Sequence, residues 1–153
     1  SIFGSRSNGY KVEVGLMEPI RHYYENGSIS QERWFVNGEL HRLDGPASIW
    51  YYTNGSIMSE RWYVNNEYHR LDGPSDIQYY GDGSIRHEHW YINGEYHRLD
   101  GPANISYYND GSIRSEEWYI NDIFIVIIPW LKENNITAPF SEEDLMAIKL
   151  RWG

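Results

Sequence analysis

Histidine, arginine and aspartate recur together in this chain, and these residue types can build metal sites or acid–base pairs. The hexapeptide His-Arg-Leu-Asp-Gly-Pro occurs at 41–46, 69–74 and 97–102. If two strands separate equivalent histidines, they lie about 10 Å apart, whereas the ligands of one zinc ion lie about 2.0 Å from it. We therefore expect no shared metal, and hydrogen bonds that hold a structural turn instead. The turn residues are His41, Asp44, His69, Asp72, His97 and Asp100.

Glutamates recur at one position of the same pattern, at residues 32, 60, 88 and 116. Two carboxylates about 5–9.5 Å apart can act as the acid and base of a glycosidase. Such a site needs two differently tuned groups, but a repeat supplies the same group each time, so we expect each glutamate to pair with an arginine or a hydroxyl. Glu88 is flanked by His87 and His89, which alternation places on the opposite face of a strand. The prediction is a non-enzymatic protein with no catalytic residue, no metal and no cofactor.

Aromatic side chains are the strongest candidates for binding, since the chain holds 14 Tyr, 7 Trp and 4 Phe. Exposed aromatic rings can anchor a protein partner or stack on sugar rings, although the same rings can simply fill the two faces of a thin sheet. Trp50 differs from the other tryptophans because its counterparts in the pattern are Gln78 and Ser106. The candidate binding surface comprises Trp34, Trp50, Trp62, Trp90, Trp118, Tyr52, Tyr80 and Tyr108.

The element that must position these residues is a repeat of 28 residues. Tyrosine pairs stand at 23–24, 51–52, 79–80 and 107–108, and 19 of the 25 aromatic residues lie between residues 23 and 120. Each unit has two turn signals, an Asn-Gly or Asp-Gly pair at 26–27 and its equivalents, and a second pair at 37–38 and its equivalents. Such pairs tolerate the positive φ angles of type I′ hairpin turns. The sequence therefore predicts an antiparallel meander.

Strand periodicity predicts which side chains share a face. Segments such as 57–64 are rich in β-branched and aromatic residues, and a bend is expected at each Asp-Gly-Pro because proline lacks a ladder donor. Strict alternation places Glu60, Trp62 and Val64 on one face and Ile57 with Tyr63 on the other. Equivalent residues of successive units should then form rows across the sheet.

The two ends depart from the repeat. Residues 1–22 echo it weakly and are interpreted as an N-terminal capping segment, 23–122 as the repeat sheet, and 123–153 as an apolar last strand followed by a helical cap. A short helix is expected over Pro129–Asn135 and another over Ser141–Arg151, where Ser141 caps and acidic residues follow. Leu145, Ile148 and Trp152 would face the sheet. A helix that docks a partner is the alternative to a lid on the last strand.

The amino-acid composition restricts the classes of partner that this chain could bind. The chain of 153 residues has no cysteine and a formal charge of −9, which argues against direct binding of nucleic acid or an anionic membrane. Units 23–50, 51–78 and 79–106 each hold four acids and two arginines, a charge of −2. An even acidic surface of this kind could imitate nucleic acid in a basic groove. The longest apolar run, 123–130, is too short to span a bilayer, and the absence of cysteine favours the cytoplasm, including that of a host.

The run from Glu60 to Pro74, followed by Tyr79-Tyr-Gly-Asp-Gly, resembles the MORN-repeat family, in particular its bacterial and viral variant. The resemblance covers about residues 16–122. It implies an elongated antiparallel sheet that acts as a scaffold or binding surface, and some bacterial relatives are antitoxin-like. It implies no catalytic residue.

These observations predict a mainly β protein, an elongated twisted antiparallel β-meander of 28-residue repeats with a small C-terminal α-helical cap. The expected function is a protein–protein interaction module or scaffold. Two alternatives remain open at this point: a carbohydrate-binding module that uses the Trp and Tyr rows, and a viral, phage or antitoxin-like inhibitor that sequesters a host or toxin protein.

Overall fold

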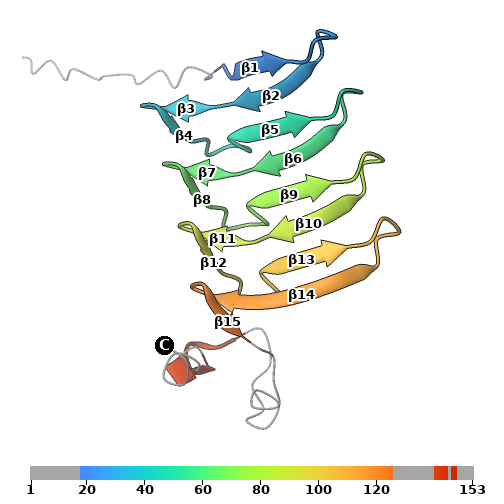
Figure 1. Cartoon of the computed structure of the whole chain (residues 1–153). Coiled ribbons are helices and arrows are strands. Elements are labelled where there is room, and N and C mark those ends of the chain that lie inside the picture. The colour runs from blue at the N-terminus through green and yellow to red at the C-terminus, as the bar shows by residue number, and fades with distance from the viewer. Residues whose placement is uncertain (1–17, 126–139, 145, 148–153) are drawn as a thin grey trace, which may run out of the picture.

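The chain folds into one long antiparallel meander, in which each strand of the main sheet follows its sequence neighbour (Figure 1). The structure is a computed structural model and describes residues 18–125, 140–144 and 146–147. The mainly β, repeat-based architecture predicted from the sequence is confirmed. The main sheet contains, in spatial order, β1 (Ile20–Tyr23), β2 (Ile29–Arg33), β5 (Ser48–Tyr51), β6 (Ile57–Arg61), β9 (Asp76–Tyr79), β10 (Ile85–His89), β13 (Asn104–Tyr107), β14 (Ile113–Ile120) and β15 (Ile123–Ile125).

Short hairpins form one edge of this stack, on the left in Figure 1. Each follows a strand of the main sheet and precedes a His-Arg-Leu-Asp-Gly-Pro loop, so the bend predicted at Asp-Gly-Pro is present as a loop outside the strands. A further hairpin, built from the end of β14 and β15, is not followed by this hexapeptide. The short hairpins are β3 (Phe35–Val36) with β4 (Glu39–Leu40), β7 (Tyr63–Val64) with β8 (Glu67–Tyr68), and β11 (Tyr91–Ile92) with β12 (Glu95–Tyr96).

Only one of the two turn sets has the predicted type I′ conformation. In the short hairpins both central residues have positive φ, for example 51° at Asn65 and 65° at Asn66. At the other edge only the glycine does, as at Gly55 with φ of 85°, so the type I′ prediction is wrong there. The side-chain carbonyl oxygen of Asn54 accepts hydrogen bonds from the amide and hydroxyl of Ser56, at 3.0 and 2.8 Å, which holds a three-residue loop that ends on a left-handed glycine.

A β-bulge corrects the predicted faces of the sheet. Tyr51 pairs with Ile57 but Trp50 pairs with Ser59, so β6 has one extra residue, Met58, between these positions. Strict alternation would place Ile57 and Ser59 on one face. Because the bulge interrupts it, Ile57 lies opposite Tyr51 and on the face of Glu60, and the prediction for Ile57 is wrong. The same shift recurs in the other long hairpins.

Few side chains are fully buried, as expected for a single sheet. The residue after each loop proline is small and inaccessible to solvent, namely Ala47, Ser75 and Ala103. Its carbonyl accepts a hydrogen bond from the tryptophan amide of the same layer, for example Trp62 to Ser75 at 2.8 Å. The small side chain allows the loop to return close to the sheet.

The ends are described in part. At the C-terminal end, the Ser141 hydroxyl accepts a hydrogen bond from the Asp144 amide at 3.1 Å, and the Asp144 carboxylate accepts from the Ser141 amide at 2.8 Å, so the predicted cap is confirmed. Residues 142–144 and 146–147 are helical. The predicted helix over 129–135, the side chains of Leu145, Ile148 and Trp152, and residues 1–17 of the capping segment lie outside the described residues. Within the described ranges, no helix has the length and apolarity needed to cross a membrane.

Candidate protein-binding face

One face of the main sheet is the same in every unit, and we call it the repeated face. From β2 to β14 its central row alternates glutamate and isoleucine, and Arg21 of β1 lies opposite Glu32. On the same face, each first tyrosine of a Tyr-Tyr pair lies opposite an isoleucine, as Tyr51 does opposite Ile57. The Tyr79 hydroxyl donates to the Glu60 carboxylate at 2.7 Å, and Tyr51 and Tyr107 do the same with Glu32 and Glu88. Burial, then the hydrogen bond to Glu88, raises the pKa of Tyr107 to about 12. These glutamates are therefore acceptors for structural hydroxyls, the pairing anticipated from the sequence.

The tryptophans that end the glutamate strands are covered by arginine. The guanidinium carbon lies 4.2 Å from the ring centre of Trp34, 4.1 Å from that of Trp62 and 3.8 Å from that of Trp90. Each arginine comes from the following loop, Arg70 in the case of Trp62, and its Nε donates to Asp72 at 2.8 Å. These rings are only partly exposed and have cationic partners of their own.

Glycine in the loop accommodates this arginine. A Cβ atom on Gly73 would lie 2.7 Å from the guanidinium carbon of Arg70, and one on Gly101 would lie equally close to Arg98. Neither glycine has a positive φ. The residue is thus needed for close approach, with the guanidinium between the indole ring and the loop backbone.

The histidines link one unit to the next. The Nδ1 atom of His41 lies 2.8 Å from the Asn65 side-chain oxygen, His69 lies 2.9 Å from that of Asn93, and His97 contacts Asn121 in the same way at 2.7 Å. The asparagines have positive φ and belong to the next hairpin turn. Within the loop itself, Asp44, Asp72 and Asp100 accept from the arginine two residues earlier. The histidines therefore lie between units, and the aspartates lie within the loops.

The second tyrosine of a Tyr-Tyr pair also links one unit to the next through a hydrogen bond. The hydroxyl of Tyr52 donates to the carbonyl of Tyr79 at 2.8 Å, and that of Tyr80 donates to the carbonyl of Tyr107 at the same distance. Tyr108 occupies the equivalent place in the last unit and is 51% exposed. Of the eight aromatic residues proposed from the sequence as a binding surface, Trp50 and Tyr108 are exposed and the others are partly buried.

The opposite face changes from unit to unit, and we call it the varied face. It consists of two parallel cross-strand rows whose members share a face because they pair directly in the register. The first row is Gln31, Trp50, Ser59, Gln78, His87, Ser106 and Ser115. The second row is Arg33, Ser48, Arg61, Asp76, His89, Asn104 and Glu117.

Trp50 projects from the varied face with 38% of its surface exposed. Its direct neighbours in the row, Gln31 and Ser59, are both buried. An indole ring beside polar, buried side chains offers a protein partner both apolar area and a donor N–H.

A polar network centred on Asp76 lies in the second row. Asp76 is 5% exposed, and its carboxylate accepts from Arg61 at 3.3 Å, Gln78 at 3.2 Å and His89 at 3.2 Å. Burial alone would raise the pKa of Asp76, but the hydrogen bond from His89 and the charge of Arg61 outweigh it and hold that pKa below its ordinary value. The network fixes the donors and acceptors that the varied face presents. None of Arg61, Asp76 and His89 was selected from the sequence, although comparison of the units position by position would have marked all three.

A column of tyrosines borders the varied face. Successive ring centres in this column are 4.1–5.0 Å apart, and its members are Tyr63, Tyr68, Tyr91, Tyr96 and Tyr119. His89 contacts two of them edge-on, which joins the column to the varied face. Burial raises the pKa of Tyr68 and Tyr91. The column is continuous packing along the short hairpins, and it contacts the varied face at His89.

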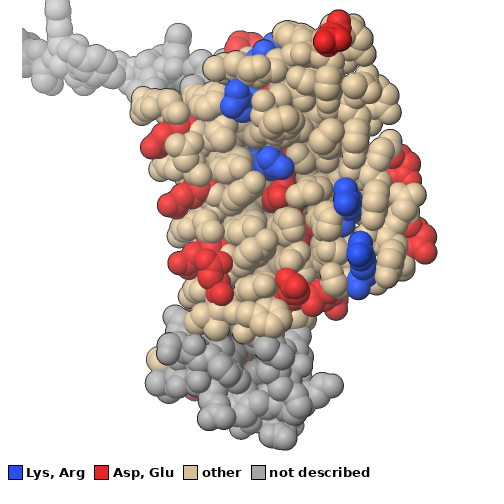
Figure 2. Space-filling view, in the orientation of Figure 1, with Lys and Arg blue, Asp and Glu red and all other residues tan. Residues whose placement is uncertain are grey.

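Charges are distributed along the hairpin edge. Figure 2 shows acidic side chains at the edge formed by the short hairpins, with basic side chains mixed among acidic ones over the sheet. Glu39, Glu67 and Glu95 are the exposed acids of these hairpins. Among the described residues, no group of three side chains is arranged to hold a metal ion. The chemistry available on the varied face is hydrogen bonding, charge pairing and apolar contact.

Comparison with known proteins gives no match, either to a protein-family model or to a curated protein sequence.

Proposed function

We propose that this chain is a non-enzymatic protein-interaction module that binds its partner through the varied face, with Trp50 at the centre of the contact. The observation that carries the proposal is the division of the sheet into two faces. The residues of the repeated face are identical from unit to unit, whereas each position on the varied face holds at least two residue types. The sheet forms with different residues at the positions of the varied face, and several of these residues are held in place by a hydrogen-bond network. Such positions are suited to specific recognition.

Exposed aromatic area supports a protein as the partner. Interface centres are enriched in tryptophan, tyrosine and arginine, and the varied face holds Trp50 in its first row and Arg33 and Arg61 in its second row. The resemblance to MORN-type repeats and the cysteine-free composition agree with an intracellular scaffold, and we keep the cytoplasm as the expected compartment.

Carbohydrate binding has less support from the geometry. Stacking on sugar rings requires free ring faces, but Trp34, Trp62 and Trp90 each have an arginine on the ring. An inhibitor that sequesters a host or toxin protein would be a special case of protein binding. The exposed acids of the hairpin edge would favour a basic partner in that case.

Photo-cross-linking tests the proposal. A cross-linking amino acid at position 78, on the varied face, should yield a discrete protein adduct in extract of the native cell. The same amino acid at position 54, in a turn at the far edge, serves as the control and should yield none. Equal labelling from both positions, or no adduct from position 78, would contradict the proposal.

A further inference from the structure

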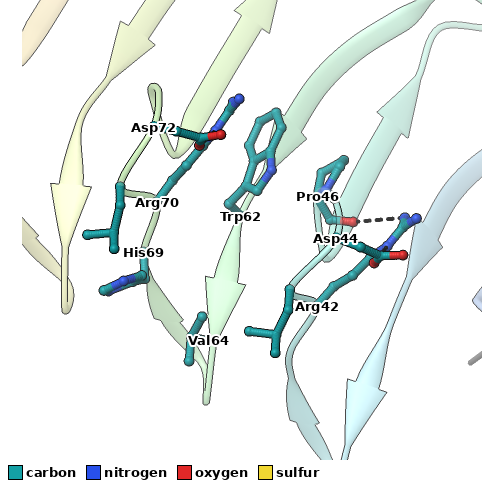
Figure 3. A pocket seen from close by; sticks show the side chains of 11 residues that line it. Arg42, Asp44, Pro46, Trp62, Val64, His69, Arg70 and Asp72 are labelled. Atoms are coloured by element: carbon teal, nitrogen blue, oxygen red, sulfur yellow. Dashed lines mark hydrogen bonds and ion pairs between the residues drawn. The ribbon is translucent and has the colours of Figure 1, made fainter. Parts of the chain in front are cut away.

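A groove lies between successive loops of the repeat, and none of its lining residues belongs to the two rows of the varied face. It has a volume of about 700 Å³ and is bounded by Leu43 and Pro46 of one loop and Leu71 of the next. Trp62 and Val64 also line it, and Figure 3 shows Trp62 between the loop that holds Pro46 and the side chain of Arg70. The groove is therefore apolar at its centre and has Arg42, Arg70 and their aspartate partners along its sides.

The loop leucine is strongly exposed in the two units that form this groove. Leu43 is 82% exposed and Leu71 is 76% exposed. Leucines exposed to this extent contribute little buried apolar area to the sheet, and here they lie on either side of an apolar groove. Leu99, at the same position of the third loop, is only 36% exposed.

Leu99 is covered by the chain itself. The amide of Phe140 donates to the Leu99 carbonyl at 3.1 Å, and the Phe140 ring meets the Trp118 ring edge-on with 5.9 Å between centres. Phe140 is 8% exposed. Leu99 and Trp118 stand in the same repeat positions as Leu43 and Trp62, so the last unit shows how the first-loop side of the groove can be covered, although no second hexapeptide loop follows Trp118.

The occupant has a defined local structure. Ser141 follows Phe140 directly and caps the helical residues through Asp144, and Glu142 and Glu143 are exposed beside it. The segment thus combines one buried aromatic ring, one backbone donor and an acidic helix start.

We propose that the groove between the loops at 41–46 and 69–74 is a docking site for a peptide segment of a partner protein that has the chemistry of residues 140–144. Its aromatic ring packs on Trp62 beside Leu43, and its amide donates to the Leu43 carbonyl, as Phe140 does at Leu99. An acidic residue near the ring meets Arg42 or Arg70. Since the varied face is not involved, this site is separate from the proposed function and can fail or succeed independently of it.

A peptide with the sequence of residues 137–147, labelled with fluorescein, tests the proposal by anisotropy against the full chain. We expect saturable binding with Kd below about 1 mM. Phe140→Ala in the peptide and Leu43→Glu in the protein should each weaken binding by about tenfold or more, since each removes the central apolar contact. Trp50→Ser is the matched control and should leave the Kd unchanged.

A second variant keeps the outcome clear. Phe140→Ala in the protein removes the ring that packs against Trp118 in the last unit, so the peptide should bind there and the number of peptide sites per chain should rise by one. The proposal is overturned by the absence of saturable binding up to about 1 mM, or by binding that Leu43→Glu leaves intact.

Discussion

Gly73→Ala is the most informative single change in the scaffold, because it tests why glycine precedes proline in each loop. The added Cβ would lie 2.7 Å from the guanidinium carbon of Arg70, where an ordinary carbon contact is about 3.5–4.0 Å. The guanidinium must move by roughly 1 Å. It currently lies 4.1 Å from the Trp62 ring centre and donates to the Pro74 carbonyl at 3.2 Å.

The expected cost follows from these two contacts. The cation–π contact contributes about 0.5–1 kcal/mol at a partly exposed site, and the hydrogen bond to the Pro74 carbonyl contributes about 0.5–1.5 kcal/mol. Asp72 is exposed, so its ion pair with Arg70 is not counted. Gly73→Ala should therefore lower the free energy of unfolding by about 1–2.5 kcal/mol, measured by urea unfolding followed by circular dichroism.

Two controls isolate the cause. Gly81 has ordinary φ, and a Cβ atom added there would have no other atom within 4 Å, so Gly81→Ala should be neutral or stabilise by up to about 1 kcal/mol. In an Arg70→Ala background, Gly73→Ala should cost less than about 0.5 kcal/mol, because the clash is absent. An unchanged cost in that background would refute the role assigned to the guanidinium.

Three further predictions concern stability. The pKa of Tyr107 is raised to about 12 from an unfolded value of about 10. The protonated Tyr107 hydroxyl therefore contributes its full stability below about pH 10, and this contribution is lost as the pH rises from about 10 to about 12. Tyr107→Phe should flatten this part of the plot of unfolding free energy against pH. The pKa of Asp76 is lowered, so the stability that its carboxylate contributes is present above about pH 3.9 and is lost as the pH falls through the folded-state pKa. Asp76→Asn should remove this acid dependence from the plot of unfolding free energy against pH. Ala103 is fully buried, and Ala103→Leu should lower the free energy of unfolding in urea by about 1–3 kcal/mol, whereas Ser115→Leu on the exposed sheet surface should not.

The repeat made most of the fold predictable. Tyrosine pairs, tryptophans and Asn-Gly turns at a constant spacing define the strands and their order, since adjacent strands joined by tight turns must pair in a meander. The faces were harder to predict. The extra residue at Met58 has no compositional signature, and strict alternation fails at the bulge because it depends on which backbone groups pair.

The side-chain contacts between successive units also could not be predicted from the sequence. His41 and Asn65 are 24 residues apart, and their contact depends on how closely one short hairpin stacks on the next. Residue type alone places the tryptophans on a binding surface, but an arginine eight residues later covers the ring in each of the first three units. Trp50 is distinguishable in the sequence because it breaks the repeat. The same comparison at every position marks the varied face, but it also marks turn and bulge positions such as Thr53 and Met58.

The affinity of the cross-linked partner for Trp50→Ser tests the central claim most directly. Serine is the residue at the equivalent position 106, so the scaffold already accommodates it. We predict that the variant stays folded, with a free energy of unfolding lower by about 1–3 kcal/mol because the indole is partly buried, while partner binding weakens by about tenfold or more. Unchanged affinity of the folded variant would contradict recognition through the varied face.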